Sequence, residues 1–286
     1  MVRREQAGRA WLWRVANGRF PRTGLRHFVA LVEQAAAASG AKVRRHSDHW
    51  LAEVVGDDRR VLVIGQVFPL NNAASAQVAT DNQVATDKVA TCRLLGDAGV
   101  PAVPHHLLRF ADLADPVALA RSLVGLPAVL KLHRESSGVD VLRARTAEDA
   151  ARVLGHLAAR SRAIAVSPFL VIDDEYRVVV LDGEVLLVYR KVIAPGEWRH
   201  SLKFGARPDP AVPPATRAAL VPMVRDAMRA LELRFASVDI ALVGGAPMVL
   251  EINSGVTLEH FSQAGPQHQA LAADVYRAAI HASLTD

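Results

Sequence analysis

The segment MVLEINSGVTLEHF, residues 248–261, sets Glu251 and Asn253 inside an apolar run. Side chains point alternately to the two faces of a β-strand, so Glu251 and Asn253 are expected on one face. The opposite face is expected to carry Met248, Leu250 and Ile252. Polar side chains inside an apolar strand need hydrogen-bond or ionic partners. The preceding strand contains a further carboxylate that could lie close to them.

That strand, FASVDIALV at residues 235–243, is joined to the segment by the turn GGAP. Pairing about Gly245 places Asp239 within about one residue of the position opposite Glu251. Two carboxylates that close repel each other unless a cation or a proton lies between them, so removing one should relieve repulsion in the metal-free protein. Carboxylate and amide oxygens are typical Mg²⁺ ligands, which indicates a metal site; a solvent-facing polar hairpin surface is the alternative.

The composition is that of a globular chain of 286 residues, with 51% hydrophobic residues and a formal net charge of +5. Its arginines are scattered and its aromatic residues are few, which argues against nucleic-acid binding. Cys92 is the single cysteine, which favours a cytoplasmic protein without an internal disulfide. Polar residues interrupt the N-terminal segment, and no apolar run reaches the roughly 18 residues of a membrane span, so neither a secretory signal nor a membrane partner is expected.

Hydrophobic periodicity predicts mixed helices and strands, with hairpins concentrated late in the chain, which is typical of an α+β fold. Helices are predicted over residues 25–39 and 87–98, and another begins at Thr146. A hairpin is predicted around Asp182 and Gly183. A later helix is expected to bury a stripe consisting of Leu220, Val224, Met228 and Leu231.

Five segments in a fixed order carry a family resemblance: TDKVATCRLLGDAGVP, PAVLKLHRESSGV, EYRVVVLDGEVLLVYRKV, WRHSLKFGA and VDIALVGGAPMVLEINSG. They resemble the ATP-grasp superfamily, and more narrowly the carboxylate–amine ligases related to glutathione synthetase and the ribosomal-protein glutamate ligases. The resemblance runs from about Asp87 to the C-terminus. It implies a nucleotide held between two α+β subdomains, residues 86–168 and 169–286. Hydrophobic patterning predicts a small N-terminal α/β domain, residues 1–85, which is expected on the substrate side.

The resemblance implies that Lys88 and Lys131 contact the phosphates of ATP. A lysine inside an apolar strand is costly unless it meets an anion, which supports Lys131, whereas an exposed first-turn lysine is the alternative for Lys88. The loop HRESSGV, with Ser137 and Gly138, would cover the phosphates through backbone N–H groups. Family loops carry several glycines, and this loop carries only Gly138.

Further nucleotide and substrate contacts follow from the same resemblance. The segment SPFLV stands where the family holds adenine, through backbone groups near Phe169 and Leu170. Glu175 matches an acidic position that meets the ribose, and a solvated hairpin glutamate is the alternative. Arg177 and Arg190 match arginines that reach phosphate or the acyl substrate, and Arg190 joins the implied catalytic set.

The segment WRHSLKFGA supplies the other implied catalytic residues. Arg199 matches an arginine near the transferred phosphate, and Lys203 stands where relatives carry a basic residue or a histidine; a mobile basic loop is the alternative for both. The family's metal ligands are matched by Asp239, Glu251 and Asn253. They would bind a pair of Mg²⁺ ions, for which Mn²⁺ can substitute.

The implied reaction is ATP-dependent ligation of a carboxylate to an amine through an acyl phosphate, with release of ADP and phosphate. Such phosphoryl transfer demands positioning and charge neutralisation, which agrees with the missing nucleophile motif. The adjacent His105 and His106 point to opposite faces of a strand and have no zinc-ligand spacing. An ATP-grasp small-molecule kinase and a catalytically inactive nucleotide-binding module are the alternatives. Expected partners are a small-molecule carboxylate and amine, such as an amino acid or peptide, and a homodimer is left open.

Overall fold

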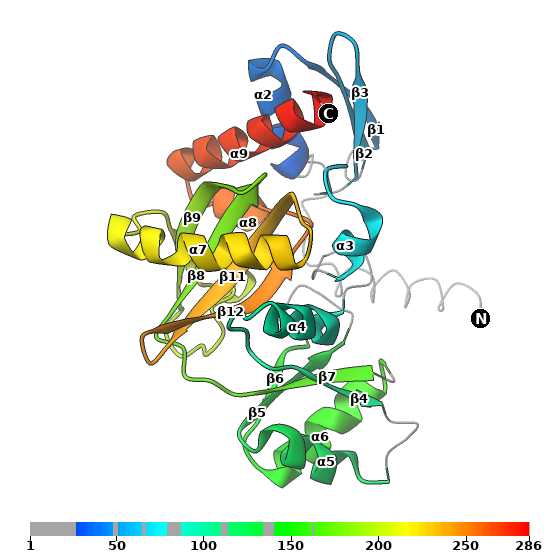
Figure 1. Ribbon diagram of the computed structural model, residues 1–286, viewed down its shortest axis with the longest axis vertical. Coiled ribbons are helices and arrows are strands. Elements are labelled where there is room, and N and C mark those ends of the chain that lie inside the picture. Colours follow the sequence, from blue (N-terminus) through cyan, green and yellow to red (C-terminus); the bar gives the residue numbers. More distant parts are fainter. Residues whose placement is uncertain are drawn as a thin grey trace, which may run out of the picture.

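The computed structural model describes residues 27–47, 51–64, 67–78, 87–109, 114–133, 140–161 and 163–285 (Figure 1). Strands in these ranges form three antiparallel sheets, of three, five and four strands. The sheets follow one another along the long axis of the molecule, with helices packed on their faces (Figure 1). This mixed architecture confirms the predicted α+β class. Among the described helices, none has the length and apolar character needed to cross a membrane.

The central sheet has the strand order β10-β9-β8-β11-β12. Its strands are β8 (Asp174–Leu181), β9 (Glu184–Val192), β10 (Arg207–Asp209), β11 (Phe235–Val243) and β12 (Ala246–Asn253). Both predicted hairpins are present. The turn Asp182–Gly183 joins β8 to β9, and the turn Gly244–Gly245 joins β11 to β12, with positive φ at all four residues. Such φ values give the turn the twist of the paired strands and favour glycine.

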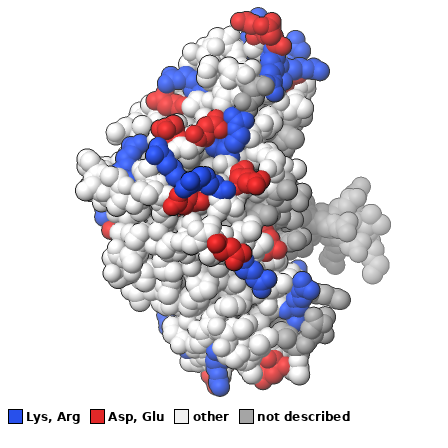
Figure 2. All heavy atoms as spheres, viewed as in Figure 1, with Lys and Arg blue, Asp and Glu red and all other residues white. Residues whose placement is uncertain are grey.

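One face of the central sheet is covered by α7 (Pro214–Ala230). The predicted stripe of Leu220, Val224, Met228 and Leu231 is buried there against Val178, Val238 and Ile240. The outer surface of α7 carries charges of both signs (Figure 2). Several of these arginines form ion pairs, as Arg225 does with Glu184 and Arg229 with Asp226.

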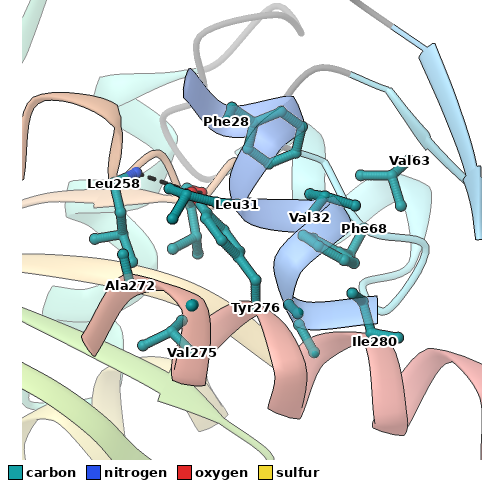
Figure 3. Close-up of a cluster of buried hydrophobic side chains, with 14 of the residues drawn as sticks. Phe28, Leu31, Val32, Val63, Phe68, Leu258, Ala272, Val275, Tyr276 and Ile280 are labelled. Carbon is teal, nitrogen blue, oxygen red and sulfur yellow. Dashed lines mark hydrogen bonds between the residues drawn. The ribbon is translucent and has the colours of Figure 1, made fainter. Parts of the chain in front are cut away.

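Part of the opposite face packs against α8 (Glu259–Ser262), α9 (Pro266–Thr285) and α2 (His27–Ala38), next to the small sheet. That sheet consists of β1 (Lys42–Ser47), β2 (Leu51–Val55) and β3 (Arg60–Ile64), and α3 (Ala73–Val78) follows it. The described part of residues 1–85 therefore shares a hydrophobic core with the C-terminal part of the chain (Figure 3). Inside this core, the Leu258 N–H donates to the Tyr276 hydroxyl, which donates to the Val256 carbonyl, at 3.0 and 3.1 Å.

The third sheet has the order β4-β7-β5-β6 and is backed by α5 (Pro116–Val124) and α6 (Ala147–Ala158). Its strands are β4 (His106–Arg109), β5 (Ala128–Leu132), β6 (Leu142–Ala144) and β7 (Ala163–Pro168). The predicted cap is present, because the Thr146 hydroxyl accepts from the Asp149 N–H at the start of α6. Strand β7 ends at Pro168.

A short backbone contact brings the two larger sheets together. Helix α4 (Lys88–Asp97) leads into residues 101–103, which lie beside β12. The Val103 N–H donates to the Val249 carbonyl, and the Val249 N–H donates to the Pro101 carbonyl, both at 2.9 Å. The start of α4 is therefore held near the strand that carries Glu251 and Asn253.

Candidate active site

The half of the central sheet that α8 and α9 leave uncovered is polar. Neighbouring positions on three strands carry charged side chains on the same face, and β12 adds a carboxylate and an amide. This polar face consists of Glu175, Arg177, Lys191, Asp239, Glu251 and Asn253. Five of these six residues were predicted as site residues, whereas Lys191 takes the place expected of Arg190.

A β-bulge explains the exchange of Lys191 for Arg190. In the β8–β9 hairpin, Val180 pairs with Val185 but Val179 pairs with Leu187, so one extra residue is inserted in β9. Because side chains alternate, one extra residue moves every later side chain of β9 to the other face. Arg190 therefore lies opposite Tyr176, on the α7 side, where it approaches Asp174 and Asp209 at 3.5 and 3.3 Å. The structure does not bring Arg190 into the polar face.

A second bulge lies beside Asp239. Asp239 pairs with Glu251, as predicted, but Ile240 pairs with Val249, so Leu250 is the extra residue. The expected apolar face of β12 is therefore partly wrong, because Val249 and not Met248 shares the buried core with Ile252. Bulges are frequent next to active sites, where they change the direction of side chains. Here one bulge in each hairpin determines which side chains lie on the polar face.

Asp239 is the centre of a buried charge network. Arg177 donates to both of its carboxylate oxygens at 2.7 Å, and Lys191 Nζ lies 2.9 Å from Oδ2. Lys191 also donates to Glu175 at 2.5 Å. Burial alone would raise the pKa of Asp239, but Arg177 and Lys191 outweigh burial and lower this pKa to about 2. The expected repulsion between Asp239 and Glu251 is therefore neutralised by protein cations, and removing Asp239 would leave two buried cations short of a partner.

The side chains of Glu251 and Asn253 have polar atoms that could contact a ligand. The Glu251 carboxylate forms no ion pair with a described residue, and the buried Asn253 Nδ2 has no hydrogen-bond partner in the described chain. The ends of an amide are exchangeable by rotation, so the Asn253 oxygen can occupy that position. A divalent cation would find two carboxylates and one amide here, a donor set that suits Mg²⁺. These residues therefore fit the metal that the family resemblance implies.

Two lysines lie near Glu251 from the other side. Lys88, at the start of α4, is 5% exposed and lines a small cavity together with Glu251. Lys131, on β5, is half-buried. Burial lowers the pKa of Lys131 to about 8, with Glu251 opposing this shift and Lys88 adding to it. The His133 ring lies 3.3 Å from Asp87 and joins the end of β5 to the start of α4.

The segment expected to hold adenine lies beside an aromatic contact. Phe169 and Leu170 follow β7 and are half-buried, and the Phe169 N–H donates to the Pro127 carbonyl at 3.0 Å. The Phe169 ring packs on Trp198 at a centroid distance of 5.7 Å, and the Arg143 guanidinium lies 4.7 Å from the Phe169 ring centre. The third sheet is thus linked to the loop after β9.

The other two predicted catalytic residues lie in that loop and the short helix η2 (Leu202–Phe204). Arg199 donates to both carboxylate oxygens of Glu197, at 3.1 and 2.7 Å, and stacks on Phe204. These hydrogen bonds lower the pKa of Glu197 to about 2. Lys203 is exposed and is not joined to the polar face by a described contact. The expected loop residues Ser137 and Gly138 lie outside the described ranges.

The comparisons with known proteins define the class. The fold is that of the ATP-grasp ligases: a solved D-alanine–D-alanine ligase from Bacillus anthracis superposes with a TM-score of 0.55 at 16% identity, covering 74% of this chain and 71% of that one. The same enzyme complexed with ATP gives a TM-score of 0.54 at 16% identity, over 74% and 70% of the two chains. Residues 85–272 match the model of the RimK-like ATP-grasp domain. The chain belongs to the RimK-like ATP-grasp family, which confirms the resemblance.

Curated relatives are similar at a moderate level. A D-alanine–D-alanine ligase of Desulforudis audaxviator is 29% identical, over 70% of this chain and 67% of the relative. A probable alpha-L-glutamate ligase of Alcanivorax borkumensis is 28% identical, over 68% of this chain and 61% of the relative. The match thus spans between 61% and 67% of the length of these relatives.

The charge network predicts opposite effects for two neighbouring carboxylates. We expect Asp239→Asn to lower the free energy of unfolding by about 3–5 kcal/mol, because it leaves Arg177 and Lys191 buried with less negative charge. We expect Glu251→Gln, the matched control, to change it by less than about 1 kcal/mol, because Glu251 is in no described ion pair. Urea unfolding measures both, and equal losses would contradict this assignment.

The same network predicts a dependence on pH. The pKa of Asp239 in the folded protein, about 2, lies below its ordinary value of 3.8. Its stabilising contribution is therefore complete above pH 3.8 and is lost as the pH falls through 3.8 towards 2. The difference in unfolding free energy between wild type and Asp239→Asn should shrink over this range.

Proposed function

We propose that this protein is an ATP-dependent carboxylate–amine ligase that forms an amide bond and releases ADP and phosphate. The observation that carries the proposal is the polar face with Asp239 opposite Glu251 and with Lys88 and Lys131 nearby. Oxygen ligands for a divalent cation next to cations for phosphate are what a magnesium–nucleotide complex requires. Membership of the RimK-like family supports the assignment.

Each group of residues has a proposed task. Asp239, Glu251 and Asn253 would hold Mg²⁺, which would offset the negative charge of the phosphates. Lys88 and Lys131 bind the phosphates, and Ser137 and Gly138 belong to the loop that covers them. Arg177 and Lys191 keep Asp239 ionised and oriented. Phe169 and Leu170 border the adenine, and Glu175, paired with Lys191, stands nearest the ribose.

The proposed reaction has two steps. A carboxylate oxygen of the first substrate attacks the γ-phosphorus of ATP, the bond to the β-phosphate oxygen breaks, and ADP leaves. The amine of the second substrate then attacks the acyl carbon, phosphate leaves, and the amine gives up a proton. Arg199 and Lys203 are the proposed cations that neutralise the transferred phosphate. To reach the phosphate, Arg199 would release its hydrogen bonds to Glu197.

The substrates are proposed from the names of the relatives. One relative is a D-alanine–D-alanine ligase and another a probable alpha-L-glutamate ligase, so amino acids or peptides are the proposed carboxylate and amine. We also propose a division into an N-terminal substrate-side segment, residues 1–85, and two nucleotide-binding parts, residues 86–168 and 169–286. A cytoplasmic location is proposed because ATP and free amino acids are available there.

The ligase proposal predicts amine-dependent turnover. Purified protein is incubated with ATP, Mg²⁺ and pooled amino acids, and ADP, phosphate and new masses are quantified. We expect equal amounts of ADP and phosphate together with a condensed mass that loses one water. ADP with a phosphorylated product that needs no amine would identify a kinase instead. ATP binding without any turnover would support the inactive binding module.

The pKa of Lys131 predicts the pH dependence of nucleotide binding. Lys131 is charged below its pKa of about 8, so its attraction for phosphate weakens as the pH rises through about 8. The dissociation constant for ATP should therefore increase between pH 7 and 9. In Lys131→Arg the guanidinium stays charged over this range, so the increase should be smaller. Identical pH profiles would show that Lys131 does not contact the phosphates.

A further inference from the structure

His105 is a buried histidine to which the family resemblance gives no role. It precedes β4 and is 7% exposed. Its Nδ1 lies 2.8 Å from the Val103 carbonyl oxygen. A carbonyl can only accept, so Nδ1 carries the proton and donates, and Nε2 presents a lone pair. Burial, reinforced by Lys131 and Lys88, lowers the pKa of His105 well below its ordinary value, so the ring is neutral.

The Nε2 of His105 needs a donor. It is buried and has no hydrogen-bond partner among the described residues. A buried acceptor without a donor destabilises the folded protein. His105 lines the same small cavity as Lys88, Cys92 and Glu251. The space at its centre is about 10 Å³, at the lower end of what one water molecule needs.

Lys131 lies on the same face of the third sheet as His105. Leu107 pairs with Ala165, and Ala165 pairs with Lys131, so Leu107 and Lys131 share a face. His105 precedes Leu107 by two residues, and the alternation of an extended chain puts it on that face too. Lys131 has no described hydrogen bond or ion pair, although its ammonium offers three donors.

We propose that His105 is a positioning residue for Lys131: one water beside Nε2 joins this acceptor to the Lys131 ammonium and holds this cation towards the nucleotide phosphates. The inference rests on the proposed function. A neutral acceptor suits this task better than a carboxylate, because it orients the ammonium without cancelling its charge. In the polar face, by contrast, the carboxylates of Asp239 and Glu175 form ion pairs with Arg177 and Lys191 and neutralise their charges.

The test compares three variants of the full chain by their ATP affinity, measured by calorimetry, and their melting temperature. His105→Phe keeps the ring volume and removes the acceptor; it should weaken ATP binding about tenfold without lowering the melting temperature. His105→Gln restores an acceptor and should stay within about threefold of wild type. His106→Phe, the adjacent control on the opposite face, should not change ATP affinity.

A double-mutant cycle separates a positioning role from a structural one. In a Lys131→Met background, His105→Phe should cause no further loss, because His105 acts through Lys131. A full additional tenfold loss, or equal ATP affinity of His105→Phe and wild type, would overturn the inference and leave the proposed function standing. If the wild-type chain binds no ATP, the proposed function itself fails, and the inference fails with it.

Discussion

The buried contact of Asp239 with Arg177 and Lys191 is the interaction on which the candidate active site depends. An isolated carboxylate in the middle of a sheet would be very costly, and it persists because two cations from neighbouring strands reach its oxygens. Asp239 lies on β11, Arg177 on β8 and Lys191 on β9, so three strands must be in the correct register at once. The network therefore specifies the pairing of the sheet as well as its charge.

This arrangement divides the cations of the site into two groups. Arg177 and Lys191 are neutralised within the protein and stabilise the arrangement of the polar face. Lys88 and Lys131 belong to α4 and β5, and they face the same region without cancelling Glu251 in a described ion pair. An anionic ligand entering between these groups would meet the positive charge of the lysines on one side. On the other side it would meet carboxylate and amide oxygens that could hold a metal ion. That division is what a nucleotide with its metal ion requires.

Much of the fold was predictable because its signals are local. The turn sequences Asp182–Gly183 and Gly244–Gly245 predict the two hairpins, and the second hairpin places Asp239 opposite Glu251. The helix cap at Thr146 was likewise predictable, and its side chain accepts from the Asp149 N–H. These features depend on a few neighbouring residues and on strict alternation.

The features that escaped prediction depend on interactions between distant segments. Both bulges break the alternation, and neither hairpin has a glycine at its bulge to mark it, so Lys191 could not be chosen over Arg190 from the sequence. The pairing of Glu197 with Arg199 had a signal in their spacing of two residues, but that spacing is common in loops. The contact of Phe169 with Trp198 and the shared core of α2 and α9 join residues far apart in the chain.

The most direct measurement is the affinity for ATP with and without Mg²⁺, in the wild-type chain and in Glu251→Gln. Glu251 is the proposed metal ligand whose removal leaves the buried charge network intact, so a change in binding reports on the proposed metal site and not on folding. We expect Mg²⁺ to tighten ATP binding to the wild type by about tenfold or more and to have little effect on the variant. The same Mg²⁺ dependence in both proteins would contradict the assignment of this face as the metal–nucleotide site.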